Sequence, residues 1–110
     1  MPHYMFQGRY STQAIKAMVE KPQDREAAAR ELVEAAGGKM HSFFFCFGQD
    51  DVVAILEFPD DTAVSACALV LGASGALSGG ATTKLLTASE AQSAMASAKA
   101  VAGSYKPATA

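Results

Sequence analysis

Three residues of this 110-residue chain could carry proton-transfer chemistry. His3 opens the first predicted strand, Arg9 lies near the other end of that strand, and Glu57 closes the third predicted strand. A histidine beside a carboxylate can take up and release a proton near neutral pH, because its ordinary pKa is about 6.5. His3, Arg9 and Glu57 are therefore the catalytic candidates, although we favour the interpretation that they are solvated or ion-paired.

A second set of polar residues could bind a ligand without reacting with it. We expect Arg9 close to the acidic turn 50–51, where it forms a structural ion pair or, alternatively, binds an anion at the mouth of a pocket. We expect Lys84, on the fourth predicted strand, to join His3 and Glu57 at one end of the sheet. The ligand-binding candidates are Gln7, Arg9, Gln49, Asp50 and Lys84.

The sequence predicts neither a metal site nor a cofactor. His3 and His41 lie on strands that the expected topology separates by a third strand, and no HxH, HxxxH or HxxE spacing is present. We therefore interpret both histidines as surface or interface residues. Cys46 and Cys67 lie in apolar runs without an activating basic neighbour, so we interpret them as small core side chains.

The composition indicates one small domain with no strong electrostatic preference. We expect a single domain over residues 1–102 and a flexible tail over 103–110. The net charge of −2 offers no positive field for nucleic acid or an anionic membrane, so we expect neither as a partner. The absence of a CxxC pair and of a secretory signal at the start favours a reduced, cytoplasmic location.

The hydrophobic pattern predicts the elements that position these residues. Alternation indicates the first strand, and Pro22 should interrupt the helical region that follows it. Thr87 and Glu90 have capping-box spacing at the start of the last helix, whereas the glycine-rich segment 72–80 should be a flexible connection. The predicted strands cover residues 3–10, 39–47, 52–58 and about 81–86. The first predicted helix begins near Ser11, and its second part, after Pro22, covers 24–36. One further helix starts within 59–62 and ends at 71, and the last covers 88 to about 101.

This order of elements, β-α-β-β-α-β plus a C-terminal helix, predicts a ferredoxin-like α+β fold. The expected four-stranded antiparallel sheet has the order 4-1-3-2, with both helices on one face. Strands 39–47 and 52–58 carry large apolar side chains on both faces, so the uncovered face would be an apolar patch. A second copy is the simplest cover, which predicts a homodimer. We favour packing between the copies alone, and the alternative is a small-molecule pocket in or beside the interface.

Four stretches of the sequence are distinctive: Pro2–Ser11 and Phe43–Val53, which combine a glycine with apolar residues, the corner Phe58–Asp61 and the strand Thr82–Thr87. Together they resemble the GYD domain family over about residues 2–95. The tripeptide that names the family corresponds to Gly48-Gln49-Asp50, where Gln49 replaces the usual tyrosine. The resemblance implies a fold similar to dimeric α/β-barrel proteins and an assembly of two or more copies, but it implies no particular reaction.

The functional hypotheses belong to three classes. The leading one is a small-ligand-binding or interaction module that assembles through its sheet face. The alternative is a cofactor-independent enzyme, of the proton-transfer or oxygenase type, that uses His3, Glu57 or Arg9 around a pocket at that face. The third is a structural assembly protein in which the alanine-rich last helix is exchanged between subunits.

Overall fold

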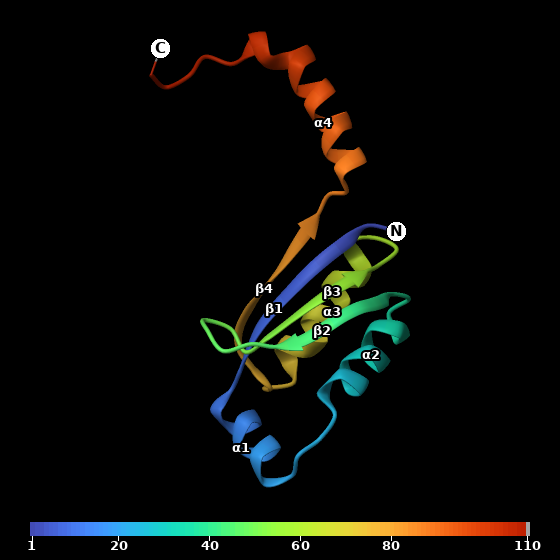
Figure 1. The fold of residues 1–110 in the computed structure, drawn as a ribbon, viewed down its shortest axis with the longest axis vertical. Coiled ribbons are helices and arrows are strands. Elements are labelled where there is room, and N and C mark those ends of the chain that lie inside the picture. Colours follow the sequence, from blue (N-terminus) through green and yellow to red (C-terminus); the bar gives the residue numbers. More distant parts are fainter. Residues whose placement is uncertain (110) are drawn as a thin grey trace.

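The structure, a computed structural model, describes residues 1–109 and has the predicted order of elements (Figure 1). Four antiparallel strands form one sheet in the order β2-β3-β1-β4, which confirms the predicted ferredoxin-like α+β fold. The strands are β1 (His3–Tyr10), β2 (Lys39–Phe45), β3 (Val52–Glu57) and β4 (Leu77–Leu85). The helices are α1 (Thr12–Glu20), α2 (Arg25–Ala35), α3 (Asp61–Ala73) and α4 (Ala88–Val101), followed by the 3-10 turn η1 (Ala102–Ser104).

Each α-helix begins where a side-chain oxygen accepts a hydrogen bond from a free backbone N–H in the first turn. In α4 this is the predicted capping box, in which the Glu90 N–H donates to Thr87 Oγ1 at 3.1 Å and the Thr87 N–H donates to Glu90 Oε1 at 2.9 Å. Pro22 lies between α1 and α2, as predicted. Among residues 1–109, no helix is both long enough and apolar enough to cross a bilayer. The other caps are Ser11 for α1, Asp24 for α2 and Asp60 for α3.

Side chains alternate between the two faces of the sheet. The helix face packs against α2 and α3, and its β1 residue Tyr4 is only 2% exposed. The opposite surface, which we call the open face, carries the odd-numbered residues of β1 and β3. The helix face includes Tyr4, Phe6, Ala54 and Leu56; the open face includes His3, Met5, Gln7, Arg9, Val53, Ile55 and Glu57.

Strand β4 is longer than predicted. It begins at Leu77, so Gly79 and Gly80 belong to the strand rather than to a flexible connection. A Cβ atom at position 80 would lie 2.6 Å from the Gln7 carbonyl oxygen of β1, closer than atoms can approach. Glycine at this position therefore allows the two strands to lie side by side.

Strand β2 is shorter than predicted, because it ends at Phe45 instead of residue 47. The Cys46 N–H donates to the Asp51 carbonyl at 2.9 Å and closes the loop between β2 and β3. The side chain of Phe47 lies in this loop and is fully exposed. A continuous run of apolar residues has no alternation that indicates where the strand stops.

The hydrophobic core lies between the helix face and helices α2 and α3. Phe58, directly after β3, has no exposed surface, and its ring meets that of Tyr4 edge to face at 6.0 Å between centroids. On the open face, by contrast, the Phe44 side chain is 64% exposed. The buried core residues are Tyr4, Val33, Met40, Ala54, Leu56, Phe58, Val64 and Cys67.

Helix α4 extends away from the rest of the domain (Figure 1). The described residues have a radius of gyration of 17.8 Å, whereas a compact chain of this length has about 13 Å. Within residues 1–109, α4 packs closely only against the adjacent turn η1, and Met95 and Val101 remain largely exposed. This weak packing within the chain leaves α4 free to contact a second copy, as the third hypothesis requires.

Candidate functional site

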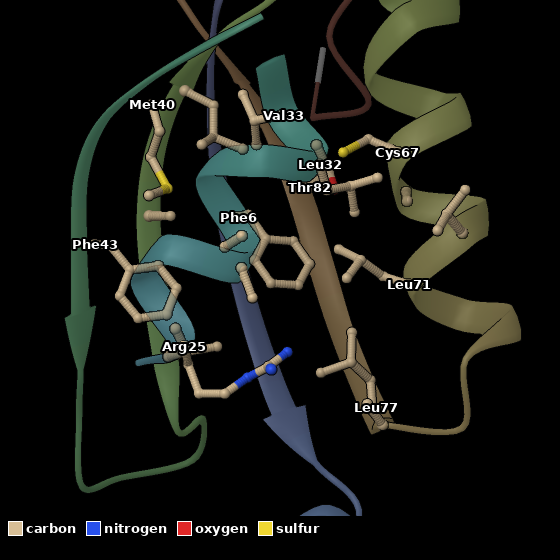
Figure 2. Close-up of a pocket in the computed structure, with 18 of the residues that line it drawn as sticks. Phe6, Arg25, Leu32, Val33, Met40, Phe43, Cys67, Leu71, Leu77 and Thr82 are labelled. Carbon is tan, nitrogen blue, oxygen red and sulfur yellow. The ribbon is translucent and has the colours of Figure 1, made fainter. Parts of the chain in front are cut away.

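A cavity of about 220 Å³ lies between the helix face of the sheet and helices α2 and α3 (Figure 2). We call it the helix-side cavity. The sequence predicts a ligand pocket at the open face and does not predict the helix-side cavity. Small side chains on the two helices, including Ala28 and Ala29 of α2 and Ala68 of α3, leave the space unfilled. Its larger apolar wall residues are Phe6, Leu32, Val33, Met40, Phe43, Leu71 and Leu77.

Few polar groups reach the helix-side cavity. Arg25, the first residue of α2, extends its guanidinium into one end of the cavity (Figure 2). Arg25 Nη1 donates to Gln23 Oε1 at 2.9 Å, but no carboxylate within residues 1–109 forms an ion pair with it. Burial raises the pKa of the nearby Tyr10, and the Arg25 guanidinium opposes part of that shift. Thr82 of β4 adds a hydroxyl to the wall.

Four of the five predicted ligand-binding residues do lie together, in a wide hollow on the open face. The hollow has a volume of about 430 Å³, and we call it the open-face hollow. The glycine-containing part of β4, residues 79–81, forms its other side. The four predicted residues in it are Gln7, Arg9, Gln49 and Asp50.

Arg9 does not form the expected ion pair with the acidic turn. Its guanidinium donates from Nε to the Gln49 carbonyl oxygen at 2.8 Å, and Nη2 donates to the same oxygen. The Asp51 carboxylate instead accepts from the Tyr10 N–H at 3.0 Å. Arg9 is therefore held in place by a neutral backbone group, and its positive charge remains available to an anion.

Lys84 lies apart from the other candidates, and its expected place beside His3 and Glu57 is wrong. It pairs in register with Tyr4, so the alternation of β4 directs it to the helix face. There Lys84 Nζ lies 3.1 Å from Asp61 Oδ1, the same oxygen that accepts from the Tyr4 hydroxyl. These two partners hold the pKa of Asp61 below its ordinary value, and the hydrogen bond to Asp61 raises the pKa of Tyr4 to about 12.

His3 and Glu57 do come together, and His41 joins them. Glu57 Oε1 lies 3.0 Å from His3 Nε2, and Glu57 Oε2 lies 3.2 Å from His41 Nε2. Partial burial raises the pKa of Glu57, but the hydrogen bond from His41 and the charges of His3, His41 and the N-terminus outweigh it and lower the pKa overall. We call these three residues the histidine cluster. Arg9 lies six residues along β1, about 20 Å from His3, so the catalytic candidates do not share one site within this chain.

His41 lies at a β-bulge in β2, and Glu57 of the strand between connects it to His3. Met40 pairs with Leu56 and Ser42 pairs with Ile55, so His41 is the extra residue on β2. The expectation that the distance between β1 and β2 keeps the histidines apart is wrong. Glu57 of β3 contacts the Nε2 atoms of both imidazole rings. The two rings stack, with centroids 5.7 Å apart and an angle of 15° between their planes.

The two thiols have different environments. Cys67 is buried in the core, as predicted, and burial raises its pKa. Cys46 is only partly buried and lies in the loop after β2, so its interpretation as a mid-strand core residue is wrong. Its thiol donates to the Asp50 carbonyl oxygen at 3.2 Å.

The model of the GYD domain family matches residues 4–95 of the sequence. This chain belongs to the GYD domain family. The match confirms the resemblance predicted from the sequence. It includes all four strands and the residues of both the helix-side cavity and the open-face hollow.

One solved structure, titled "Crystal Structure of MtbAldR (Rv2779c)", is similar to this GYD domain with a TM-score of 0.56 and 13% sequence identity. The similarity covers 78% of this chain and 53% of that chain, so the GYD domain spans about half the length of that protein. At this identity the similarity shows a shared fold alone. No curated protein matched the sequence.

Gln49 replaces the tyrosine of the family tripeptide in this GYD domain. Its backbone carbonyl binds Arg9, a contact that does not depend on which side chain the position carries. The substitution therefore leaves the support of Arg9 intact. It removes only an aromatic side chain from the rim of the open-face hollow.

Proposed function

We propose that this GYD domain binds a small, largely apolar molecule with a negatively charged end in the helix-side cavity. The observation that carries the proposal is an apolar cavity of about 220 Å³ into which the Arg25 guanidinium points. Arg25 is half-buried and has no ion-pair partner within residues 1–109. A half-buried charge without a counter-ion is costly, so an anionic ligand is favoured there.

The arrangement of the walls gives the ligand an orientation. Figure 2 shows Arg25 and Leu77 at one end of the cavity and Met40, Val33 and Cys67 at the other. The planar guanidinium matches the geometry of a carboxylate, whereas the far end is mainly apolar and carries the Thr82 hydroxyl but no charged group. A medium-chain fatty acid or an aromatic carboxylate fits this description, with its carboxylate at Arg25 and its apolar part toward Met40.

The binding module assembles with a second copy through its open face. The exposed apolar residue Phe44 and the residues Met5, Val53 and Ile55 on that face support this part of the proposal, because monomers seldom expose such patches. The open-face hollow would then lie in or beside the interface. Arg9 would give the open-face hollow a positive charge, which matches the predicted anion-binding role of Arg9 at the mouth of a pocket.

The enzyme alternative has less support. A proton-transfer site needs its acid, base and substrate-binding groups around one pocket. His3 and Glu57 are within hydrogen-bonding distance, but Arg9 lies about 20 Å from them and no helix-side cavity residue belongs to this group. A binding function therefore accounts for more of the geometry.

Titration of the full chain with octanoate and with 1-octanol tests the proposal, because the two probes share an alkyl chain and differ in charge. Calorimetry gives the affinities, and NMR shifts of the Leu32 and Met40 methyl groups report occupancy of the cavity. The Arg25→Gln variant removes the cation. Arg30→Gln is its matched control, because Arg30 lies on the same helix but outside the cavity. Ala68→Leu fills the cavity.

We expect octanoate to bind more tightly than octanol and Arg25→Gln to weaken octanoate binding by about tenfold or more, which corresponds to the loss of one charged contact. Arg30→Gln should bind like the unchanged chain, and Ala68→Leu should weaken both probes. If octanoate does not shift the methyl signals, or if Arg25→Gln binds octanoate as well as Arg30→Gln does, the proposal is wrong.

A further inference from the structure

The histidine cluster presents three potential ligand atoms to one point on the open face. One ring nitrogen of His3, one ring nitrogen of His41 and a carboxylate oxygen of Glu57 all lie within 4.8 Å of one another. They come from three neighbouring strands, β1, β2 and β3, at the same end of the sheet. A sheet is a rigid support, so these positions do not depend on a flexible loop.

The separations between these atoms suit a bound metal ion. In a tetrahedral site the metal–nitrogen and metal–oxygen distances are about 2.0–2.2 Å, which places neighbouring ligand atoms about 3.3 Å apart. Glu57 already lies 3.0 Å from His3 Nε2 and 3.2 Å from His41 Nε2. Small side-chain rotations would therefore be enough to enclose an ion.

The chemistry of the donor set points to a class of metal. Two neutral imidazoles and one carboxylate suit divalent transition metals such as Zn²⁺, whereas Mg²⁺ and Ca²⁺ prefer oxygen ligands alone. In the single chain the side chains of His3 and His41 are 35% and 39% exposed, so a further ligand, either water or a group of the second copy, can reach the ion. Three protein ligands with a position left for water are typical of catalytic rather than structural zinc sites.

We propose that His3, His41 and Glu57 bind one divalent transition-metal ion of the zinc class, with a further coordination position left for water or for a group of the second copy. The site is independent of the proposed ligand in the helix-side cavity, because the two lie on opposite faces of the sheet. This proposal replaces the expectation from the sequence that the chain binds no metal. That expectation depended on the separation of β1 and β2, which Glu57 bridges from the strand between them, because each of its carboxylate oxygens contacts one histidine.

Titration of the metal-free, untagged full chain with ZnCl₂ by calorimetry, and with CoCl₂ by absorption spectroscopy, tests this site. The variants are His3→Gln, His41→Gln and Glu57→Gln. Glu34→Gln, on the exposed surface of α2, is the matched control for loss of a carboxylate. Circular dichroism of each variant establishes that it is folded.

We expect one Zn²⁺ per chain, d–d bands of a four-coordinate Co²⁺ complex, and affinity about tenfold weaker or more in each ligand variant but unchanged in Glu34→Gln. A folded chain that binds no Zn²⁺ would overturn the proposal. So would Zn²⁺ binding that persists at full strength in all three ligand variants, because the ion would then be elsewhere, for example on Cys46. Neither result would affect the octanoate experiment.

Discussion

A single carboxylate connects three elements of the fold. Asp61 is the first residue of α3, and it accepts from Tyr4 of β1 and pairs with Lys84 of β4. Both partners are available only if the sheet has its native register. Asp61 therefore fixes the start of α3 relative to the two strands, and Lys84 contributes an ion pair to this contact.

The lowered pKa of Asp61 predicts how stability changes in acid. In the unfolded chain this carboxyl takes up a proton near its ordinary value of 3.8, whereas the folded chain resists protonation until a lower pH. The contribution of Asp61 is complete above the unfolded pKa and is lost as the pH falls through the folded pKa. Urea unfolding measured from about pH 7 down to about pH 2 should show this loss.

Tyr4→Phe and Asp61→Asn are the informative variants, because each removes one side of the hydrogen bond. Each should flatten the acid dependence of the unfolding midpoint, and the double variant should be no flatter than Asp61→Asn alone. An acid profile in Asp61→Asn that matches the unchanged chain would show that other carboxyl groups dominate the loss.

At the scale of elements, the contact between β1 and β4 depends on one glycine. A Cβ at position 80 would meet the Gln7 carbonyl oxygen at 2.6 Å, whereas a Cβ at position 79 would meet nothing within 4 Å. The two glycines are adjacent in β4, but only position 80 lacks space for a side chain. Substitution at position 79 is therefore a matched control for substitution at position 80.

Gly80→Ala should destabilise the domain by about 1–3 kcal/mol, because β1 and β4 must separate to accept the methyl group. Gly79→Ala should change the free energy of unfolding by no more than about 0.5 kcal/mol. Urea unfolding followed by circular dichroism measures both. Equal effects of the two substitutions would show that the strands are free to shift and that the close approach is not a constraint.

Local signals in the sequence were sufficient to predict much of the fold. The range of β1, the Pro22 break and the Thr87 capping box were predicted correctly, because alternation, a missing N–H and a hydroxyl cap act within a few residues. The start of β4 was not predicted. Gly79 and Gly80 indicate a loop by propensity, and only the backbone of β1 explains why they lie in a strand.

The candidate sites were less predictable because they depend on contacts between distant residues. The two histidines meet because Glu57, on the strand between them, contacts both, and no local spacing in the sequence indicates this contact. The helix-side cavity depends on how far α2 and α3 lie from each other, which their alanine content suggests but does not determine. Alanines that face a cavity, such as Ala68, are the one signal that could have indicated it.

At the scale of the whole molecule, α4 is incompletely packed. With α4 included, the described residues measure 59 × 33 × 22 Å, and the long axis reflects the extension of this helix. The apolar residues Met95 and Val101 of α4 are 68% and 64% exposed. An isolated helix of this length is marginal in water, so a surface that covers it would stabilise it. A second copy of the chain is the partner that the exposed sheet face also favours.

Deletion of residues 88–110 tests the role of this helix in assembly. We expect the full chain to sediment as a dimer or larger species and the truncated chain to form particles with fewer copies, because a contact between copies is lost. Sedimentation velocity over a range of concentrations gives the number of copies per particle for both chains. An unchanged number of copies would assign the assembly to the open sheet face alone.

The direction of α4 is set by its capping box, which leaves only Leu86 and Thr87 between the strand and the helix. Geometry then decides whether association terminates or propagates. Two copies related by a twofold axis can each receive the other's helix, so both helices are used and the particle closes. In a head-to-tail arrangement whose rotation does not close a ring, one helix stays unpaired at the end of the particle, and that end recruits further copies into a filament.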